Sequence, residues 1–170
     1  MAIIKHEDLG KIRKKFRDKT IVYCSGSFDL PHLGHILHLN YCKKLGDILV
    51  VNVGPDSDIK KNKGGGRPIL NQKIRLRTLD FLKPVDFVFL GRAFKDGEHP
   101  FSHLAEVLKK LAPDIYVINR DSGQIIPQIR KVAKQFKIKL MVTGRKFPKE
   151  FRDISTTKIV KKIKKVETLK

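Results

Sequence analysis

The fold is decided by residues 26–35, Gly-Ser-Phe-Asp-Leu-Pro-His-Leu-Gly-His. They follow a β-branched, apolar run at 20–24 and precede an amphipathic run at 36–42, so we predict a turn from a buried strand into a helix. Backbone N–H groups at such a turn have no intrachain partners, and the helix dipole adds to their attraction for an anion. His32 and His35 are three residues apart and lie on one face beside that anion site. The stretch therefore predicts a phosphate site.

Other roles for these two histidines are a helix cap, a surface position and a zinc site. A lone histidine near a helix start is usually a cap or a surface residue. Two of them with Gly34 between favour a functional site, because glycine lets a ligand approach the backbone. No third zinc ligand at a usable spacing accompanies the pair. We therefore expect no metal held by a dedicated cage of protein ligands.

The length and the cysteine usage predict one domain in a reducing compartment. The 170 residues suffice for a single domain that buries ~70% of its unfolded surface, with an N-terminal helical segment at 1–19 and a core at 20–166. Cys24 and Cys42 fall in the first expected strand and helix, as small core residues would. No secretion signal and no run of ~20 apolar residues is visible. We expect a cytoplasmic protein without a membrane partner.

The charge is strongly positive, with 37 Lys and Arg against 17 Asp and Glu and a formal net charge of +20. Such a charge suggests nucleic-acid binding, but much of it lies on the polar faces of amphipathic segments such as 156–166. Signatures of zinc fingers, KH domains and aromatic single-strand readers are missing. Nonspecific nucleic-acid affinity and steering of polyphosphate ligands follow from the same field. A basic RNA-binding protein with an inactive site is the non-enzyme alternative.

Strand-like and helix-like segments alternate along the chain, which predicts an α/β fold. We expect a doubly wound, five-stranded parallel sheet with helices on both faces, and a ligand site beyond the carboxyl ends of its strands. The expected strands lie near 20–25, 47–53, 86–90, 114–118 and 138–142. The expected helices lie near 7–17, 33–45, 71–82, 101–111, 124–136 and 156–166.

Two further segments have the composition of phosphate-binding elements. Residues 54–68 are predicted to be a long irregular connection, in which three glycines flanked by cations suit a flap over phosphates. The Walker pattern is missing from it. Ser155, Thr156 and Thr157 stand at the start of the last expected helix. One hydroxyl there is an ordinary N-cap, whereas three exceed what a cap requires and could donate to phosphates.

Several stretches match one enzyme family in the same order. They are 25–30, 32–35, 43–47, 59–64, 67–69, Arg75 and 155–163. Over nearly all of 20–166 the chain resembles the cytidylyltransferase-like branch of the His-x-Gly-His nucleotidyltransferases, which implies a Rossmann-like fold. It is most similar to the adenylyltransferase domain of bacterial ADP-heptose synthases and to glycerol-3-phosphate cytidylyltransferases, and archaeal FAD synthetases have a similar lysine-rich loop. Departures from the family pattern fall at 119–121 and 152–153.

The resemblance implies transfer of a nucleoside monophosphate from ATP or CTP to a phosphomonoester, with release of pyrophosphate. It favours ATP and a sugar 1-phosphate such as heptose 1-phosphate, with glycerol 3-phosphate and FMN as alternative acceptors. Mg²⁺ would accompany the nucleotide, and a homodimer is compatible with the family. The implied catalytic residues are His32, His35, Lys60, Lys63 and Arg75; the implied nucleotide-binding residues are Ser25, Gly26, Ser27, Phe28, Gly34, Asn119, Arg120, Asp121, Ser155, Thr156 and Thr157; Asp29 and Arg67 would bind or orient the substrate.

Overall fold

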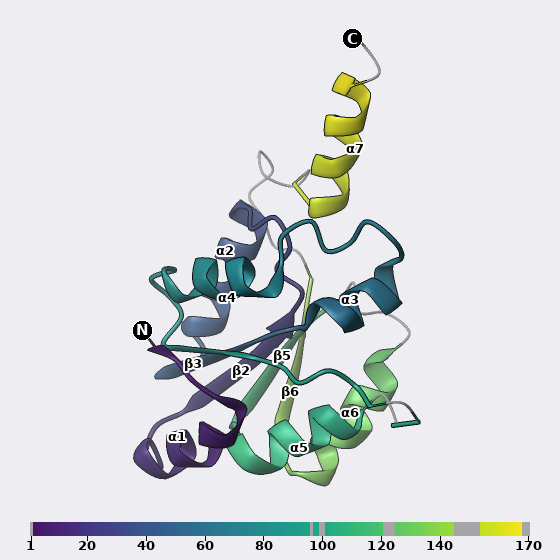
Figure 1. Cartoon of the computed structure of the whole chain (residues 1–170). Helices are drawn as coiled ribbons and strands as arrows, with labels where there is room; N and C mark the ends of the chain where they lie inside the picture. Colours follow the sequence, from purple (N-terminus) through teal and green to yellow (C-terminus); the bar gives the residue numbers. More distant parts are fainter. Residues whose placement is uncertain (1, 96, 99–100, 121–124, 145–153, 168–170) are drawn as a thin grey trace.

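The computed structural model describes residues 2–95, 97–98, 101–120, 125–144 and 154–167. These residues form a parallel sheet of six strands in the order β1-β4-β3-β2-β5-β6 (Figure 1). The strands are β1 (Ala2–Ile3), β2 (Ile21–Gly26), β3 (Ile48–Val53), β4 (Phe87–Leu90), β5 (Ile115–Asn119) and β6 (Lys139–Thr143). The predicted α/β fold with a doubly wound sheet is confirmed.

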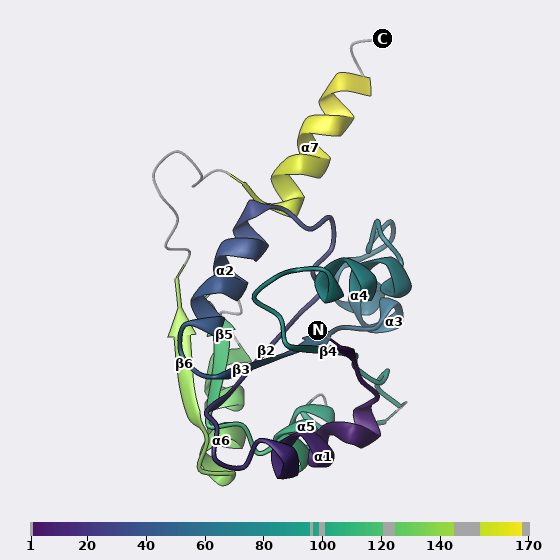
Figure 2. The ribbon, with the colours of Figure 1, turned by 90° about the vertical axis from the view of Figure 1, so that its left-hand side faces the viewer.

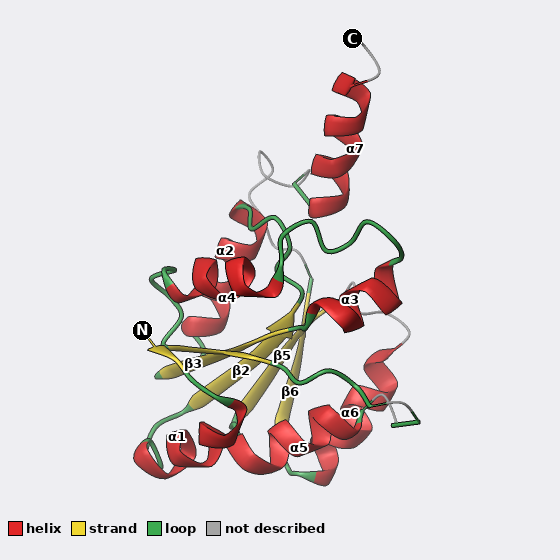
Figure 3. Ribbon diagram, in the orientation of Figure 1, coloured by secondary structure: helices red, strands yellow, loops and turns green. Residues whose placement is uncertain are grey.

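Helices cover both faces of this sheet, as Figures 2 and 3 show. One face packs against α1 (Leu9–Lys15), α5 (Ser102–Leu111) and α6 (Ile126–Gln135), and the other packs against α2 (Leu33–Lys43) and α4 (Gln72–Asp80). Along β2, Tyr23 joins the first hydrophobic cluster while Val22 and Cys24 join the second. Because both faces are buried, the central strands are continuous apolar runs.

The N-terminal segment differs from the helix predicted for it. Residues Ala2–Ile3 form β1, which pairs with β4 at the edge of the sheet, so there are six strands where five were expected. A short 3₁₀ turn, η1 (His6–Asp8), then leads into α1. Two residues are too short a run for any periodic signal, which is why the sequence pattern does not indicate this strand.

The connection at 54–68 also differs from the prediction, because half of it is helical. α3 (Asp56–Lys63) begins after Pro55 and ends at Gly64, whose φ of 84° places it in the left-handed region that favours glycine. Acidic residues lie in its first turn and lysines in its last turn, so the charges complement the helix dipole. The glycine-rich stretch after Gly64 remains irregular, as predicted.

The strand order reverses at β2, which lies between β3 and β5. The chain leaves β2 toward β3 on one side and reaches β5 on the other, and a crevice opens at such a point beyond the carboxyl ends of the strands. The last helix, α7 (Thr156–Glu167), stands over this end of the sheet, apart from the other helices (Figure 1). Within the described part of the chain, no helix combines the length and apolar character needed to span a bilayer.

Candidate active site

The two histidines of the opening stretch lie at the start of α2, where the sequence places them. His32 is the N-cap residue, with an extended backbone, and its Nδ1 accepts a hydrogen bond of 3.1 Å from the backbone N–H of Gly34. One helical turn on, the ring of His35 stacks on that of His32 with centroids 4.0 Å apart. The rings of Phe28 and His35 make an edge-to-face contact, with their centroids 5.5 Å apart. Since Nδ1 of His32 accepts, a neutral His32 carries its proton on Nε2, where it can donate.

The turn between β2 and α2 is strained and is held in place from outside. Phe28 and Leu30 adopt φ values of 46° and 45°, in the left-handed region that non-glycine residues rarely enter. Such conformations persist only where the surroundings fix them, and they gather at functional sites. Asp29, between them, is buried and accepts hydrogen bonds of 2.9–3.0 Å from the backbone N–H groups of Ile69 and Leu70.

Arg67 and Asp29 form an ion pair of 3.2 Å between Nε and a carboxylate oxygen. The sequence interpretation gave Asp29 a role in orienting substrate or Mg²⁺. In the structure both of its carboxylate oxygens are occupied by the chain's own N–H groups and by Arg67. Asp29 is therefore a positioning residue for the turn and for Arg67, which itself lines the cavity described below.

Arg75 was predicted to hold a phosphate, and its position in the structure contradicts that role. Its side chain is fully buried and lies behind the turn. The guanidinium donates to the backbone oxygens of Ser27, Gly54 and Leu70, and forms an ion pair of 2.6 Å with Asp56. Since these partners are all protein groups, Arg75 fixes the turn against α3 and does not line the cavity.

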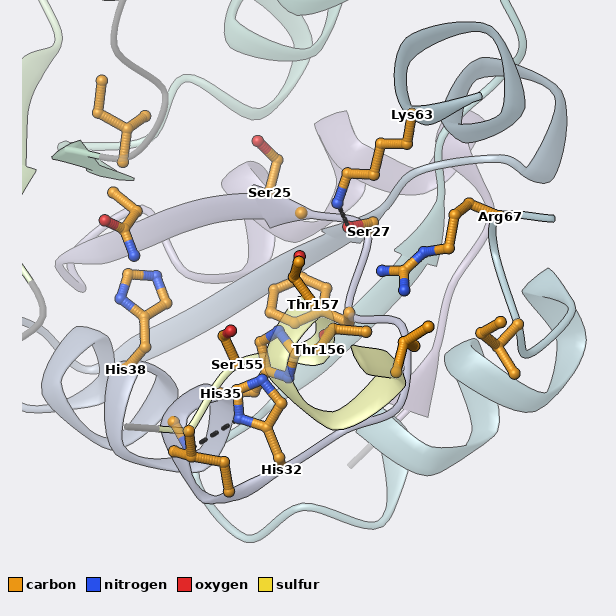
Figure 4. A pocket seen from close by; sticks show the side chains of 18 of the residues that line it. Ser25, Ser27, His32, His35, His38, Lys63, Arg67, Ser155, Thr156 and Thr157 are labelled. Atoms are coloured by element: carbon orange, nitrogen blue, oxygen red, sulfur yellow. Dashed lines mark hydrogen bonds between the residues drawn. The ribbon is translucent and has the colours of Figure 1, made fainter. Parts of the chain in front are cut away.

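A cavity of about 1000 Å³ opens beside the two histidines. It lies at the switch point, because β2, β5 and α7 all contribute to its wall (Figure 4). Four cations line it, namely Lys63, Arg67, Lys161 and Lys164, and among the described residues no carboxylate does. The predicted site residues that it brings together are Ser25, Gly26, Ser27, Phe28, His32, Gly34, His35, Lys63, Arg67, Asn119, Ser155, Thr156 and Thr157. The wall is therefore suited to a polyanion.

Lys63 and Lys60 differ although both belong to α3. Lys63 extends from the end of the helix into the cavity, where its Nζ donates to Ser27 Oγ at 2.8 Å (Figure 4). Burial, and next the positive charge of Arg67, lower the pKa of Lys63. A bound phosphate would offset the repulsion between the positive charges of Lys63 and Arg67. Lys60 is exposed and does not line the cavity, so the structure does not place it in the predicted catalytic set.

The three hydroxyls before and at the start of α7 take different roles. Ser155 Oγ accepts from the backbone N–H of Lys158 at 3.2 Å, which is an ordinary N-cap bond. Thr156 Oγ1 donates to the backbone oxygen of Asp29 at 2.8 Å and so ties α7 to the turn. Thr157 is exposed and faces the cavity. Thr157 is thus the hydroxyl best placed to meet a ligand.

The remaining predicted residues lie around β5. Asn119, at the end of β5, lines the cavity. Arg120 is exposed and lies outside the lining, while Asp121 falls outside the described residues. The departure noted at 152–153 also lies outside them.

The sequence interpretation missed a histidine and an apolar part of the wall. His38, one turn beyond His35 on α2, lines the cavity, and its spacing of i+3 from His35 was the available signal. The apolar part comprises Tyr116, Ile118, Ile125, Ile129, Ile154 and Val160. Their apolar character looks like that of core residues, so only the topology reveals that they face a cavity.

The whole arrangement belongs to a known family. The family model described as cytidylyltransferase-like matches residues 23–162, from the middle of β2 into α7. The chain belongs to the cytidylyltransferase-like family. This confirms the class of nucleotidyltransferase that the resemblance implied.

Individual relatives agree with this membership. The Bifunctional protein HldE of Aliarcobacter butzleri is 32% identical over 95% of this chain, and that of Campylobacter fetus subsp. fetus is 36% identical over 86%. The chain spans only 31% and 28% of the length of these two relatives. A solved lipopolysaccharide core biosynthesis protein from Thermoplasma volcanium is 30% identical, with a TM-score of 0.61 over 74% of this chain and 95% of its own.

A more distant solved structure shares the fold. Pantoate-beta-alanine ligase from Francisella tularensis has a TM-score of 0.58 over 94% of this chain and 76% of its own, at 16% identity. At that identity the likeness concerns only the architecture.

Proposed function

We propose that this chain transfers a nucleoside monophosphate from ATP or CTP to a phosphomonoester. An oxygen of the acceptor phosphate attacks the α-phosphorus, the bond from that phosphorus to the bridging oxygen of the β-phosphate breaks, and pyrophosphate leaves. The observation that carries the proposal is the stacked pair of His32 and His35 at the start of α2, which faces a cavity with cations and no described carboxylate. Nucleotidyl transfer requires groups that stabilise charge on phosphate oxygens, and this wall supplies them.

The chain's own residues would act by positioning and by electrostatic stabilisation. Nε2–H of His32 and the ring of His35 donate to oxygens of the α-phosphate at the N-terminal end of α2, where the helix dipole adds to the attraction. Lys63 and Arg67 neutralise the outer phosphates or the acceptor phosphate. No side chain needs to form a covalent intermediate, because the acceptor supplies the nucleophile.

The lining has an apolar part and a cationic part, and each suits a different part of a nucleotide. The apolar part from β5 and α6 suits a base and a ribose, which bury mainly apolar surface. The cationic part, from α3, the glycine-rich segment and α7, suits the triphosphate, and the histidines of α2 lie beside it. We propose that Asn119, at the border between the two, contacts the nucleoside.

Mg²⁺ is proposed to enter as part of the nucleotide substrate. The described lining offers no carboxylate, and the oxygens of Asp29 already accept hydrogen bonds from the chain. A cation of this kind coordinates phosphate oxygens and several waters readily. The residues present therefore fit a metal held by the triphosphate and not by a protein cage.

The preferred acceptor is a sugar 1-phosphate with ATP as the donor, and heptose 1-phosphate is the first candidate. The resemblance to ADP-heptose synthases, the HldE relatives and the lipopolysaccharide core neighbour all support this choice. Glycerol 3-phosphate with CTP and FMN with ATP are the alternatives that the sequence leaves open.

The test is a crossed panel of donors and acceptors with the products identified by mass spectrometry. ATP and CTP are each paired with heptose 1-phosphate, glycerol 3-phosphate and FMN, and pyrophosphate is measured in parallel. We expect pyrophosphate and a diphosphate-linked product with ATP and the sugar phosphate. The proposal fails if no pair gives pyrophosphate, neither triphosphate raises the melting temperature, and RNA binds tightly and sequence-selectively at physiological salt.

A further inference from the structure

Three metal-ligating side chains meet between β2 and α2, next to the candidate active site. Cys24 comes from β2, and His38 and Cys42 come from one face of α2, at the i, i+4 spacing. One ligand atom from each lies within 4.8 Å of the other two, and Cys42 Sγ is 3.6 Å from His38 Nε2. Both cysteines are fully buried free thiols.

We propose that Cys24, His38 and Cys42 bind a thiophilic divalent cation, with Zn²⁺ as the best fit. Zinc prefers sulfur and imidazole ligands at ~2.0–2.3 Å in a tetrahedral arrangement, which places neighbouring ligand atoms ~3.3–3.8 Å apart. The separation of 3.6 Å between Cys42 Sγ and His38 Nε2 falls within that range. Cys24 Sγ lies within 4.8 Å of both of these atoms, close enough to complete the set through a side-chain adjustment.

The charge balance explains why a buried ion is tolerable at this place. Two thiolates cancel the charge of a divalent cation, and a neutral imidazole adds none, so the loaded site is neutral. The surroundings are apolar, since Val22, Leu39 and Leu49 belong to the same buried cluster as the two cysteines. A neutral complex avoids most of the cost of burying charge.

A second cluster of ligating groups fits a cation less well. His6, His103 and Glu106 also lie within 4.8 Å of one another. The carboxylate of Glu106, however, receives hydrogen bonds of 2.9 Å from both Arg92 and Lys110. A divalent ion there would meet two positive side chains and one negative ligand, so the comparison favours the thiol site.

The proposed site borders the cavity through His38. His38 lines the cavity on the opposite side from Lys63 and Arg67 (Figure 4), whereas the two cysteines are enclosed in the core. His38 is therefore the ligand that a molecule in the cavity can reach. An ion would also join α2 to β2 on either side of the phosphate-binding turn, and its binding does not depend on the reaction proposed above.

The experiment is a titration of the reduced, chelator-treated full chain with Co²⁺ under argon. We expect one equivalent to give the near-ultraviolet thiolate-to-cobalt charge-transfer band and the visible bands of a tetrahedral ion, and Zn²⁺ to displace it. Binding should release protons, because thiols must ionise to ligate. This measurement needs no variant and no nucleotide.

Variants then locate the ion. Cys24→Ala and Cys42→Ala should each abolish the charge-transfer band or weaken Co²⁺ binding by more than the ~10–100-fold cost of losing an outer-shell partner. His103→Gln should leave the band unchanged, and circular dichroism shows whether each variant is folded. The proposal is overturned if the reduced wild type gives no charge-transfer band and releases no protons. It is equally overturned if both alanine variants bind Co²⁺ as tightly as the wild type with a band of full intensity, or if His103→Gln loses the band.

Discussion

Replacing Arg75 by methionine should destabilise the protein strongly, because this guanidinium holds the phosphate-binding turn together. The side chain is fully buried and donates to three backbone oxygens and to Asp56. Its removal leaves the carbonyls of Ser27, Gly54 and Leu70 without this donor. Each buried carbonyl that lacks a hydrogen bond lowers the free energy of unfolding by ~1–3 kcal/mol when no water replaces the donor. Partial relaxation and the partial exposure of Asp56 reduce the sum to about 3–5 kcal/mol.

The assay is urea unfolding followed by circular dichroism, with thermal melts as a second measure. A loss of about 3–5 kcal/mol corresponds to a melting temperature lower by ~6–20 °C for a chain of this size. Arg77→Met is the matched control, since Arg77 lies two residues on, is 67% exposed and forms an ion pair with Asp80. This control substitution should lower the free energy of unfolding by ~0–0.5 kcal/mol. If Arg75→Met unfolds within ~1 kcal/mol of the wild type and still loses activity, the guanidinium acts on substrate and our reasoning is wrong.

Three other predictions separate catalysis, binding and acid stability. His35→Ala should fold normally but lose ~10²–10³ in turnover measured as pyrophosphate release, and retention of more than about a tenth would exclude a catalytic role. Lys63→Met should lower kcat/KM at least ~tenfold, the value of one charge-assisted hydrogen bond, whereas Lys60→Met should stay close to the wild type in the same steady-state assay. Burial and then the charge of His6 lower the pKa of His103 to about 4 in the folded protein, below the ~6.5 of the unfolded chain. Protonation of His103 therefore favours unfolding. The urea midpoint should decrease as the pH is lowered from 6.5 to 4, and it should decrease less steeply in His103→Gln.

The features that follow from local chemistry were predictable from the sequence. The strand before the turn is a continuous run of β-branched and apolar residues, and the histidines follow it at a spacing typical of a helix start. The central strands, α2 and the pair His32 and His35 accordingly lie where expected. Lys63 lines the same cavity, and its contact with a phosphate stays a prediction. These predictions depend on residues close together in the chain.

The roles of Asp29 and Arg75 could not be predicted, because most of their partners are backbone groups. The backbone oxygens and N–H groups that they bind lie in three separate segments, at Ser27, at Gly54 and at Ile69–Leu70, which only the fold brings together. A charged residue at a matching position in a family pattern was therefore assigned to the substrate, although the fold uses it to shape the site. The apolar wall at β5 and α6 was missed for a similar reason, since a cavity and a core require the same side chains.

The bond between Thr156 and the carbonyl of Asp29 joins residues 127 positions apart. During synthesis the sheet can form once Thr143 has left the ribosome, but the wall contributed by α7 arrives only later. A nascent or truncated chain would thus have the complete scaffold and an open, unproductive cleft. The order of the elements along the polypeptide makes the α7 wall of the cavity one of the last parts of this region to be completed.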